Sequence, residues 1–331
     1  GTNQHMGTPR NPWDLDHERV PGGSSSGSGV AVASGMAMCA TGSDTGGSIR
    51  LPAAYCGLTG LKVSKTCLPT DGIMPLSNTL DTPGPMARSV ADLTLMFAVM
   101  SGVPSADIDR DMDAAAGLFD SKLSILQGLK VGVLDTVERQ VCSSDMLKSY
   151  DAALDVLGSL GAELEIFKAP VPYREMADAN GVITIYEGYL HHHALYEDPQ
   201  KKMDPNVRKR ILTGRDMTAK IHEGRLQKRQ RDQVDFALAM KGLNTLVTPT
   251  LIAPAPKLKE INEDISPGHF TRPVQYIDMC ALALPIGQSQ SGLPTSLQIV
   301  APAGQEAFVL KVGAALEKIL NIVERPNLDR L

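Results

Sequence analysis

The stretch that most constrains this chain covers residues 21–57, where 37 residues include seven serines and nine glycines. Glycine loses more conformational freedom on folding than any other residue, so such a stretch is either a linker or a backbone shaped around a ligand. Small apolar residues follow each serine–glycine cluster, over 30–40 and again over 49–61. A flexible linker lacks such flanks. The stretch therefore predicts a pair of loops packed inside a globular domain.

The composition narrows the class of protein. The 331 residues are 43% apolar and 21% charged, with a net charge of −5, which argues against a surface devoted to nucleic acid. No run of about 18 uncharged apolar residues occurs, so we expect no membrane-spanning helix. Five scattered cysteines without a CxxC pair indicate reduced thiols and a cytoplasmic protein. The seven histidines form no HExxH motif, so we expect no metal site.

Residues 129–167 carry the clearest secondary-structure pattern. The segment LKVGVLD over 129–135 predicts a buried strand, 144–160 an amphipathic helix, and AELEIF over 162–167 a second strand. A strand–helix–strand unit of this kind joins parallel strands. The pattern therefore predicts a largely parallel sheet.

Other local signals place further elements. ARSVADLTLMFAVMSG over 87–102 predicts a helix that begins with a capping pair, Ser89 and Asp92, and stops at Gly102. We also expect a packed helix over 30–40, a glycine turn over 42–48, a short helix and a buried segment within 49–61, strands over 243–248 and 293–302, and a last helix over 306–320.

The organisation predicted from these elements is a single domain over residues 1–331. No linker or internal repeat divides the chain, and residues 173–242 look helical and polar. We interpret 173–242 as a helical insertion that could serve as a substrate-specificity subdomain. The opening residues GTNQHMGTPRNPWD read as the middle of a loop, so we expect the domain to be incomplete at its N-terminus.

Several chemistries could use the serine–glycine loops. A phosphate-binding P-loop requires a lysine that is missing here, and a dinucleotide fingerprint requires a preceding strand that DHERVPGG does not form. Residues 23–27 match the GxSxG nucleophile elbow, but again without the preceding strand. A serine hydrolase with two separated serines fits better. DTGGS over 44–48 places Ser48 directly after two glycines, whose amides can turn inward to hold an oxyanion.

At this point the sequence resembles the amidase signature family. The resemblance rests on GGSSSGS over 22–28 and GSDTGGSIRLPAAYCGLTGLK over 42–62, and it continues through 75–93, 246–256 and 281–302. It covers nearly the whole chain and is weakest over 170–240. It implies an α/β fold with a mixed, largely parallel central β-sheet flanked by α-helices, an amidohydrolase activity and no cofactor.

The resemblance also implies roles for single residues. Ser48 resembles the nucleophile of a Ser–cisSer–Lys triad, and Ser24 the bridging serine, which is held by a cis peptide bond. The backbone of Thr45, Gly46 and Gly47 resembles the oxyanion hole. Further residues match the supporting positions: Ser26 and Ser43 as hydroxyls beside the bridging serine, and Asp44 and Arg50 as structural polar residues of the signature.

One member of the implied triad is missing. The family's lysine lies some tens of residues before the bridging serine, but only 23 residues precede Ser24 and none is lysine. Lys62 and Lys65 match other family segments. We therefore expect the lysine to lie in an N-terminal segment outside these 331 residues. The alternatives are an A-type subunit of a glutamine-dependent amidotransferase, with partner proteins and aminoacyl-tRNA, and a truncated or degenerate homologue that is not catalytic.

The expected partner is a small-molecule amide substrate, and the chain could form a homodimer. We expect no contact with a membrane, and none with nucleic acid except tRNA under the amidotransferase alternative. Cys56 is expected to be a packing residue, and histidines 191–193 a solvated helix face. Residues 201–231 hold eleven basic and three acidic residues. This bias indicates a solvated helical face, with attraction of an acidic substrate or tRNA as the other interpretation.

Three tyrosines complete the candidates. Tyr186, Tyr189 and Tyr196 fall on one side of a helix, where they could line an acyl pocket or equally pack in the core. Asp278 and Gln288 fall near segments that border the active site in the family. No role is assigned to either residue from the sequence.

Overall fold

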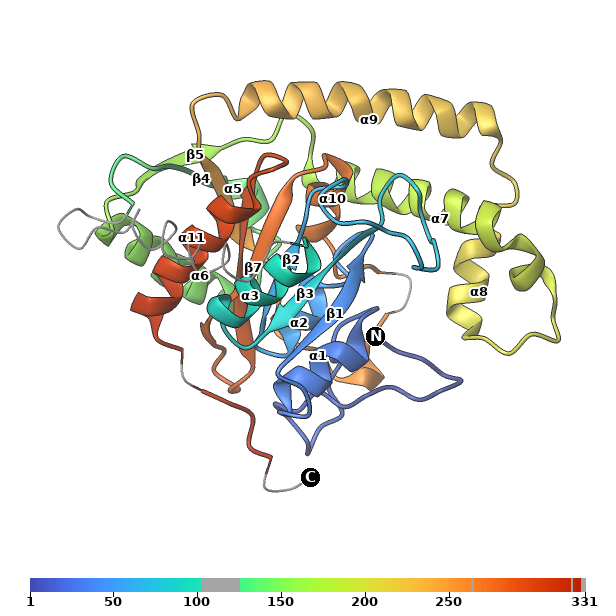
Figure 1. Cartoon of the computed structure of the whole chain (residues 1–331), viewed down its shortest axis with the longest axis horizontal. Coiled ribbons are helices and arrows are strands. Elements are labelled where there is room, and N and C mark those ends of the chain that lie inside the picture. The colour runs from blue at the N-terminus through green and yellow to red at the C-terminus, as the bar shows by residue number, and fades with distance from the viewer. Residues whose placement is uncertain (103–125, 263–264, 323, 329–331) are drawn as a thin grey trace.

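A mixed β-sheet forms the centre of the fold (Figure 1). The computed structural model describes residues 1–102, 126–262, 265–322 and 324–328, and these residues contain one eight-stranded sheet. In spatial order its strands are β1 (Cys39–Asp44), β3 (Thr82–Ala87), β2 (Thr59–Lys62), β7 (Cys280–Gln288), β8 (Pro294–Ala301), β6 (Thr245–Pro249), β4 (Lys130–Leu134) and β5 (Glu163–Phe167).

The mixed α/β sheet is confirmed, but the expectation that it is largely parallel is wrong. Among the described strands, β4 pairs in parallel with β5 and β6, while the other neighbours, from β1 across to β6, pair antiparallel. The strand–helix–strand unit predicted over 129–167 is correct but occupies one edge. Strands β7 and β8 are joined by a short turn, which can connect only antiparallel neighbours.

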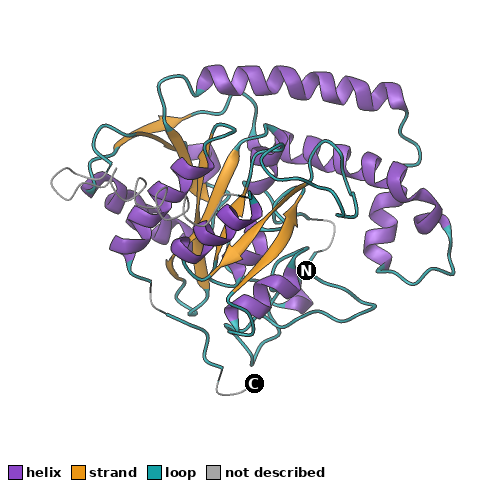
Figure 2. Cartoon of the chain, viewed as in Figure 1, coloured by secondary structure: helices purple, strands orange, loops and turns teal. Residues whose placement is uncertain are grey.

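Helices cover both faces of the sheet (Figure 2). On β7, Leu282 lies against α11 (Glu306–Leu320), where a Cβ at Gly313 would come within 2.2 Å of the leucine side chain. The next residue, Ala283, packs with Ile49 and Ala53 near α2 (Arg50–Tyr55). Since successive strand side chains point to opposite faces, α11 and α2 lie on opposite sides of the sheet.

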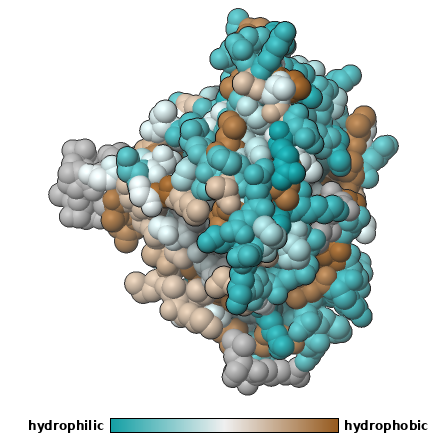
Figure 3. Space-filling model, turned by 90° about the vertical axis from the view of Figure 1, so that its right-hand side faces the viewer, coloured by the Kyte–Doolittle hydropathy of each residue, from teal (hydrophilic) through white to brown (hydrophobic). Residues whose placement is uncertain are grey.

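The polar segment 173–242 is helical, as expected. It contains α7 (Tyr173–Glu197), α8 (Pro205–Leu212) and α9 (Ala219–Ala239). Helix α7 packs against α10 (Thr271–Tyr276), while α8 lies at the far end of α7 from the sheet (Figure 1). Hydrophilic residues cover most of that end of the molecule (Figure 3). The part of α7 near the sheet reaches the loop before Ser48 through Asn180.

Most of the local predictions are confirmed. The Ser89 hydroxyl accepts a hydrogen bond from the Asp92 N–H at 3.1 Å and begins α3 (Val90–Met100). The helix expected over 144–160 is α6 (Ser144–Ser159), and the last helix spans the expected residues. These elements have strong local signals, namely caps and a 3.6-residue apolar period.

Two predictions of elements fail. The helix expected over 30–40 ends early: α1 covers Ser26–Ala33, Gly35 follows with φ +76°, and residues 39–40 belong to β1. The turn expected over 42–48 is correspondingly limited to 45–48. Strand β3 was not predicted, because Pro83 and Pro85 argue against a central strand. The strand forms because β2 pairs only with Met86 and Ala87, beyond both prolines.

Candidate active site

The two serine–glycine clusters lie side by side. The Ser25 N–H donates to the Ser48 carbonyl at 3.2 Å, which joins the first loop to the second. Gly22, with φ +82°, lies so close to Pro52 that a Cβ there would be 2.6 Å from the proline backbone. The peptide bond between Gly23 and Ser24 is cis. The fold thus brings the loops of Ser24 and Ser48 together, although 24 residues separate the two serines.

The expected supporting hydroxyls make different contacts from one another. The Ser26 hydroxyl points toward the Ser24 carbonyl at 3.5 Å, beyond the usual hydrogen-bond range. Ser43 is tied through its backbone to Ser25, not to Ser24: its N–H donates to the Ser25 hydroxyl at 3.3 Å. Ser25 therefore links the two loops through both backbone and side chain, a role that the sequence analysis did not assign to it.

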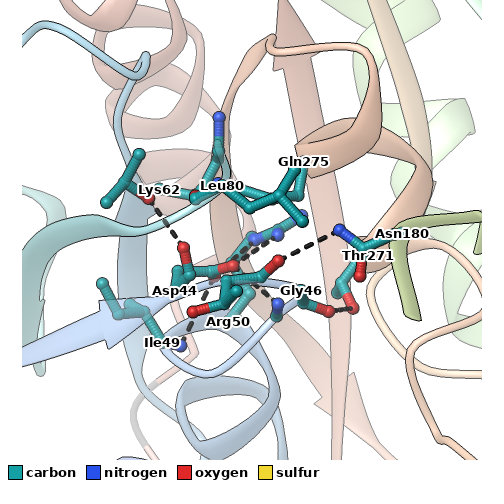
Figure 4. A network of polar contacts seen from close by, with 12 residues as sticks. Asp44, Gly46, Ile49, Arg50, Lys62, Leu80, Asn180, Thr271 and Gln275 are labelled. Atoms are coloured by element: carbon teal, nitrogen blue, oxygen red, sulfur yellow. Dashed lines mark hydrogen bonds and ion pairs between the residues drawn. The ribbon is translucent and has the colours of Figure 1, made fainter. Parts of the chain in front are cut away.

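The loop 45–48 connects β1 to α2 and is held from both sides. Asn180 on α7 donates from Nδ2 to the Thr45 carbonyl at 3.0 Å, and the Thr271 hydroxyl donates to the Gly46 carbonyl at 2.9 Å (Figure 4). A trans peptide points its C=O and the following N–H in opposite directions. The bond from Asn180 therefore also sets the direction of the Gly46 N–H.

The amides of this loop are not equivalent. The family resemblance implies that the Gly47 N–H binds the oxyanion. Here that N–H already donates to Asp44 Oδ1 at 2.6 Å and is not available for that role. In the described part of the chain, the N–H groups of Gly46 and Ser48 have no hydrogen-bond partner. Gly47 has φ +127°, and a Cβ there would lie 2.3 Å from the Thr271 hydroxyl. Only glycine fits at this point.

A buried ion pair between Asp44 and Arg50 anchors the loop 45–48 at both of its ends. Asp44 and Arg50 are both fully buried, and Arg50 donates from Nε and Nη2 to the two carboxylate oxygens, each at 2.9 Å. Arg50 Nη1 also donates to Gln298 on β8 at 2.6 Å. Burial raises the pKa of Asp44, but the charge and hydrogen bonds of Arg50, together with Lys62, hold that pKa below its ordinary value. Both side chains anchor the loop.

Asp81 anchors the loop from the start of β3. Its Oδ1 accepts from the Thr45 hydroxyl at 2.5 Å, and its Oδ2 accepts from the N–H groups of Leu76 and Ser77. The sequence analysis quoted this segment but gave Asp81 no role, and it did not find Asn180 or Thr271. Asn180 lies 135 residues from its partner, so no local pattern could have shown the contact.

Lys62 is buried on β2 and does not reach either serine loop. Its Nζ donates to the Met279 carbonyl at 2.6 Å and lies 3.8 Å from Asp278 Oδ1. Burial lowers the pKa of Lys62 to about 8, against the opposing effect of Asp278. Asp278 itself sits in the left-handed region, with φ +57°. Lys62 thus links β2 to the turn before β7.

The remaining candidates lie apart from the serines. Cys56 is buried, and burial raises the pKa of its thiol. His192, where α7 kinks, contacts the Pro75 carbonyl at 2.5 Å, and its two neighbouring histidines are exposed. Tyr186 is buried against His222, whereas the Tyr189 hydroxyl donates to Glu197 near the surface. Within the described residues, no group of three or more His, Cys, Asp or Glu is placed to hold a metal.

Comparison with known families and proteins identifies relatives of this chain. Residues 1–310 match the family described as Amidase. The chain is 32% identical to a 2-amino-5-chloromuconic acid deaminase of Comamonas testosteroni, over 97% of this chain and 69% of that protein. It is 33% identical to the A-type subunit of the glutamyl-tRNA(Gln) amidotransferase of Synechococcus sp. (strain JA-2-3B'a(2-13)), over 93% and 65%. The chain thus spans about two thirds of these relatives.

Solved structures share the fold. A crystal structure of an amidase superimposes with a TM-score of 0.83 and 29% identity, over 96% of this chain and 71% of that one. The peptide amidase of Stenotrophomonas maltophilia gives a TM-score of 0.78 and 26% identity, over 98% and 70%. Of the helices that the structure describes, none combines the length and apolarity needed to cross a bilayer.

Proposed function

This chain belongs to the amidase family, and from that membership we propose that it hydrolyses a carboxamide C–N bond through an acyl-enzyme on Ser48. The family supports amide-bond chemistry in general. The nucleophile, the proton relay and the products are our proposal. The products are a carboxylate and either ammonia or an amine.

In the proposed reaction the Ser48 hydroxyl attacks the amide carbon while its proton passes to Ser24. Ser24 relays that proton to a lysine and later returns a proton to the departing nitrogen. The N–H groups of Gly46 and Ser48 stabilise the tetrahedral oxyanion, since they are preorganised and have no other partner in the described part of the chain. Water then releases the acyl group from Ser48.

The observation that carries this proposal is the joining of the two loops at Ser48. The hydrogen bond from Ser25 places the Ser24 loop beside Ser48, and the bonds from Asn180 and Thr271 fix the loop that supplies the amides. A nucleophile, a neighbouring hydroxyl and two available donors are the groups that acyl transfer requires.

The base is proposed to lie outside residues 1–331. The residues before Ser24 include no lysine, and Lys62 is engaged with the Met279 carbonyl. A hydroxyl without a base is a weak nucleophile. The 331-residue chain by itself should therefore react slowly, and a longer form that contains the lysine should react faster.

The test is labelling with a serine-directed fluorophosphonate, followed by peptide mass mapping, on the longer form and on the 331-residue chain. We expect an adduct at Ser48 in the longer form, and none in the Ser48→Ala variant. Ser28→Ala is the matched control, because Ser28 lies on α1, just after the Ser24 loop, and its hydroxyl is bonded to the Thr41 carbonyl at 2.8 Å. Labelling at another serine, or unchanged amide hydrolysis by Ser48→Ala, would contradict the proposal.

A second candidate is a glutamine-dependent amidotransferase A-type subunit, which the 33% identity to such a protein favours. Glutaminase activity, together with co-purifying partner subunits, would distinguish it from a free-standing amidase. A degenerate, non-catalytic homologue predicts that no form of the protein is labelled at Ser48.

A further inference from the structure

Arg272 lies against the loop that precedes Ser48. It is the second residue of α10, and its N–H donates to the Gly268 carbonyl at 3.0 Å. A Cβ at Gly46 would be 3.1 Å from Arg272 Cγ and 3.6 Å from its Nε. On the other side, a Cβ at Gly181 on α7 would be 2.8 Å from its Nη1. The side chain thus runs from the Gly46 backbone to α7.

Glycines make the room for this arginine. At Gly46, Gly181 and Gly268, an added Cβ would crowd the Arg272 side chain at 3.1 Å or less. Gly181 lies inside α7, where glycine weakens a helix by roughly 1 kcal/mol relative to alanine. The sequence therefore accepts a cost in α7 to admit a guanidinium beside the loop of Ser48.

The guanidinium has no acidic partner in the described part of the chain, where no carboxylate or carbonyl accepts a hydrogen bond from it. The nearby carboxylate of Asp178 accepts from Arg174 at 3.0 Å instead. Burial and the charge of Arg210 together lower the pKa of Arg272 to about 10, against the effect of Asp178. Arg272 keeps part of its surface exposed to solvent, so the unpaired charge is partly desolvated and accessible to a ligand.

The other arginine in this region shows the contrast. Arg50, which follows the same loop, is fully buried and has a two-point bond to Asp44. Chains normally satisfy a buried arginine in this way. Arg272 has no such partner in the described part of the chain and is only partly buried, so its guanidinium is open to a charged ligand from solution.

We propose that Arg272 binds a carboxylate of the substrate, so that the amide cleaved at Ser48 belongs to a short acidic compound such as the monoamide of a dicarboxylic acid. This inference rests on the proposed function. The planar guanidinium suits two-point binding of a carboxylate. Gly46, which lies beside Arg272 Nε, is two residues from Ser48, so the Cα atoms of the two residues are within about 7 Å and we expect a short spacing between carboxylate and amide.

Binding is tested first, in the Ser48→Ala background so that no turnover interferes. The probes are malonamate, succinamate and glutaramate, each compared with its neutral diamide by calorimetry. We expect at least one monoamide to bind about 100-fold more tightly than its diamide. Arg272→Met keeps the aliphatic stem and should abolish the difference, while Arg272→Lys should retain part of it. Arg231→Met is the control, because it removes the same charge at an exposed position on α9.

Turnover separates this inference from the proposed function. With an intact Ser48, Arg272→Met should lower kcat/KM for the monoamide about 100-fold and change it less than about threefold for the diamide. If monoamides bind selectively but are not hydrolysed, the carboxylate site is supported and the proposed amidase activity is contradicted. Hydrolysis of diamides as fast as monoamides, with equal effects of Arg272→Met on both, would overturn the carboxylate site alone, as would equal binding of all three pairs.

Discussion

At the residue scale, buried charges hold the loop of Ser48. Asp44 and Arg50 are both inaccessible to solvent and satisfy one another, and Asp44 also accepts from the Gly47 N–H. A buried pair of this kind adds little net stability over an apolar pair, but removing one partner is expensive because the other charge is then stranded. The chain therefore depends on both residues together.

Asp44→Asn should destabilise the protein by about 3–5 kcal/mol, because Arg50 would lose its counter-charge. The measurement is the free energy of unfolding from denaturant titration at neutral pH. Asp155→Asn, an exposed position on α6, is the control and should change stability by less than about 0.5 kcal/mol. A loss below about 1 kcal/mol for Asp44→Asn would contradict the role assigned to the pair.

Lys62 should make stability depend on pH. Its pKa is about 8 in the folded protein and 10.5 when unperturbed, so between these values the unfolded chain holds a proton that the native state has released. Stability then rises with pH across this window. Between pH 7.5 and 9.5, the free energy of unfolding should rise by about 2 kcal/mol more than in Lys62→Met. If the free energies of unfolding of the two proteins differed by a constant amount over this range, burial would not shift the pKa of Lys62.

At the element scale, α7 and α10 hold the loop 45–48, which connects β1 to α2. Asn180 and Thr271 reach its two carbonyls from one side, and Asp81, at the start of β3, reaches Thr45. A secondary group of contacts holds the segment before β3 to α7, since Glu187 accepts from the hydroxyls of Ser77 and Thr79. The loop is therefore fixed by helices that are distant in sequence.

Asn180→Ala should lower kcat at least tenfold with a smaller change in KM, because the Gly46 N–H would lose its fixed direction while the substrate pocket remains. The measurement is steady-state kinetics on an amide that the protein hydrolyses. Thr184→Val, one turn further along α7, is the control, since that hydroxyl bonds only to a carbonyl of its own helix. Equal losses in the two variants would indicate a general effect on α7.

At the scale of the whole molecule, the serines proposed for the chemistry and the helical segment 173–242 occupy different parts of the chain. Ser24, Ser48 and the loop amides lie within the first 50 residues. The helices of 173–242 extend beyond the sheet, and only α7 touches the loop of Ser48 (Figure 1). We therefore expect the helical segment to contribute to substrate selection, alongside Arg272 on α10, without disturbing the serines.

Replacing residues 199–217, which include α8, with the matching segment of the Stenotrophomonas peptide amidase should change substrate preference and leave fluorophosphonate labelling of Ser48 intact. The reason is that α8 packs on α7 at its far end from the sheet. The measurement compares kcat/KM across a panel of amides with the labelling rate. A lost labelling rate at unchanged thermal stability would place part of the catalytic apparatus in this segment.

The sequence by itself determined the serine loops, the capped helices and the strand–helix–strand edge, because each rests on residues close together in the chain. Ser89 with Asp92 and the periodic pattern of 144–160 are such signals. It also carried the family resemblance, since the quoted motifs are contiguous. It did not determine the antiparallel majority of the sheet or strand β3, whose prolines are tolerated only because β2 is short.

Only the tertiary structure decided how the site is held. Asn180, Thr271 and Arg272 meet the loop of Ser48 across 130 or more residues, and nothing local to any of them indicates such a partner. The bond from the Gly47 N–H to Asp44, in contrast, spans only three residues. Backbone direction and charge pairing depend on which elements the fold places side by side, and that is settled by burial of the whole core.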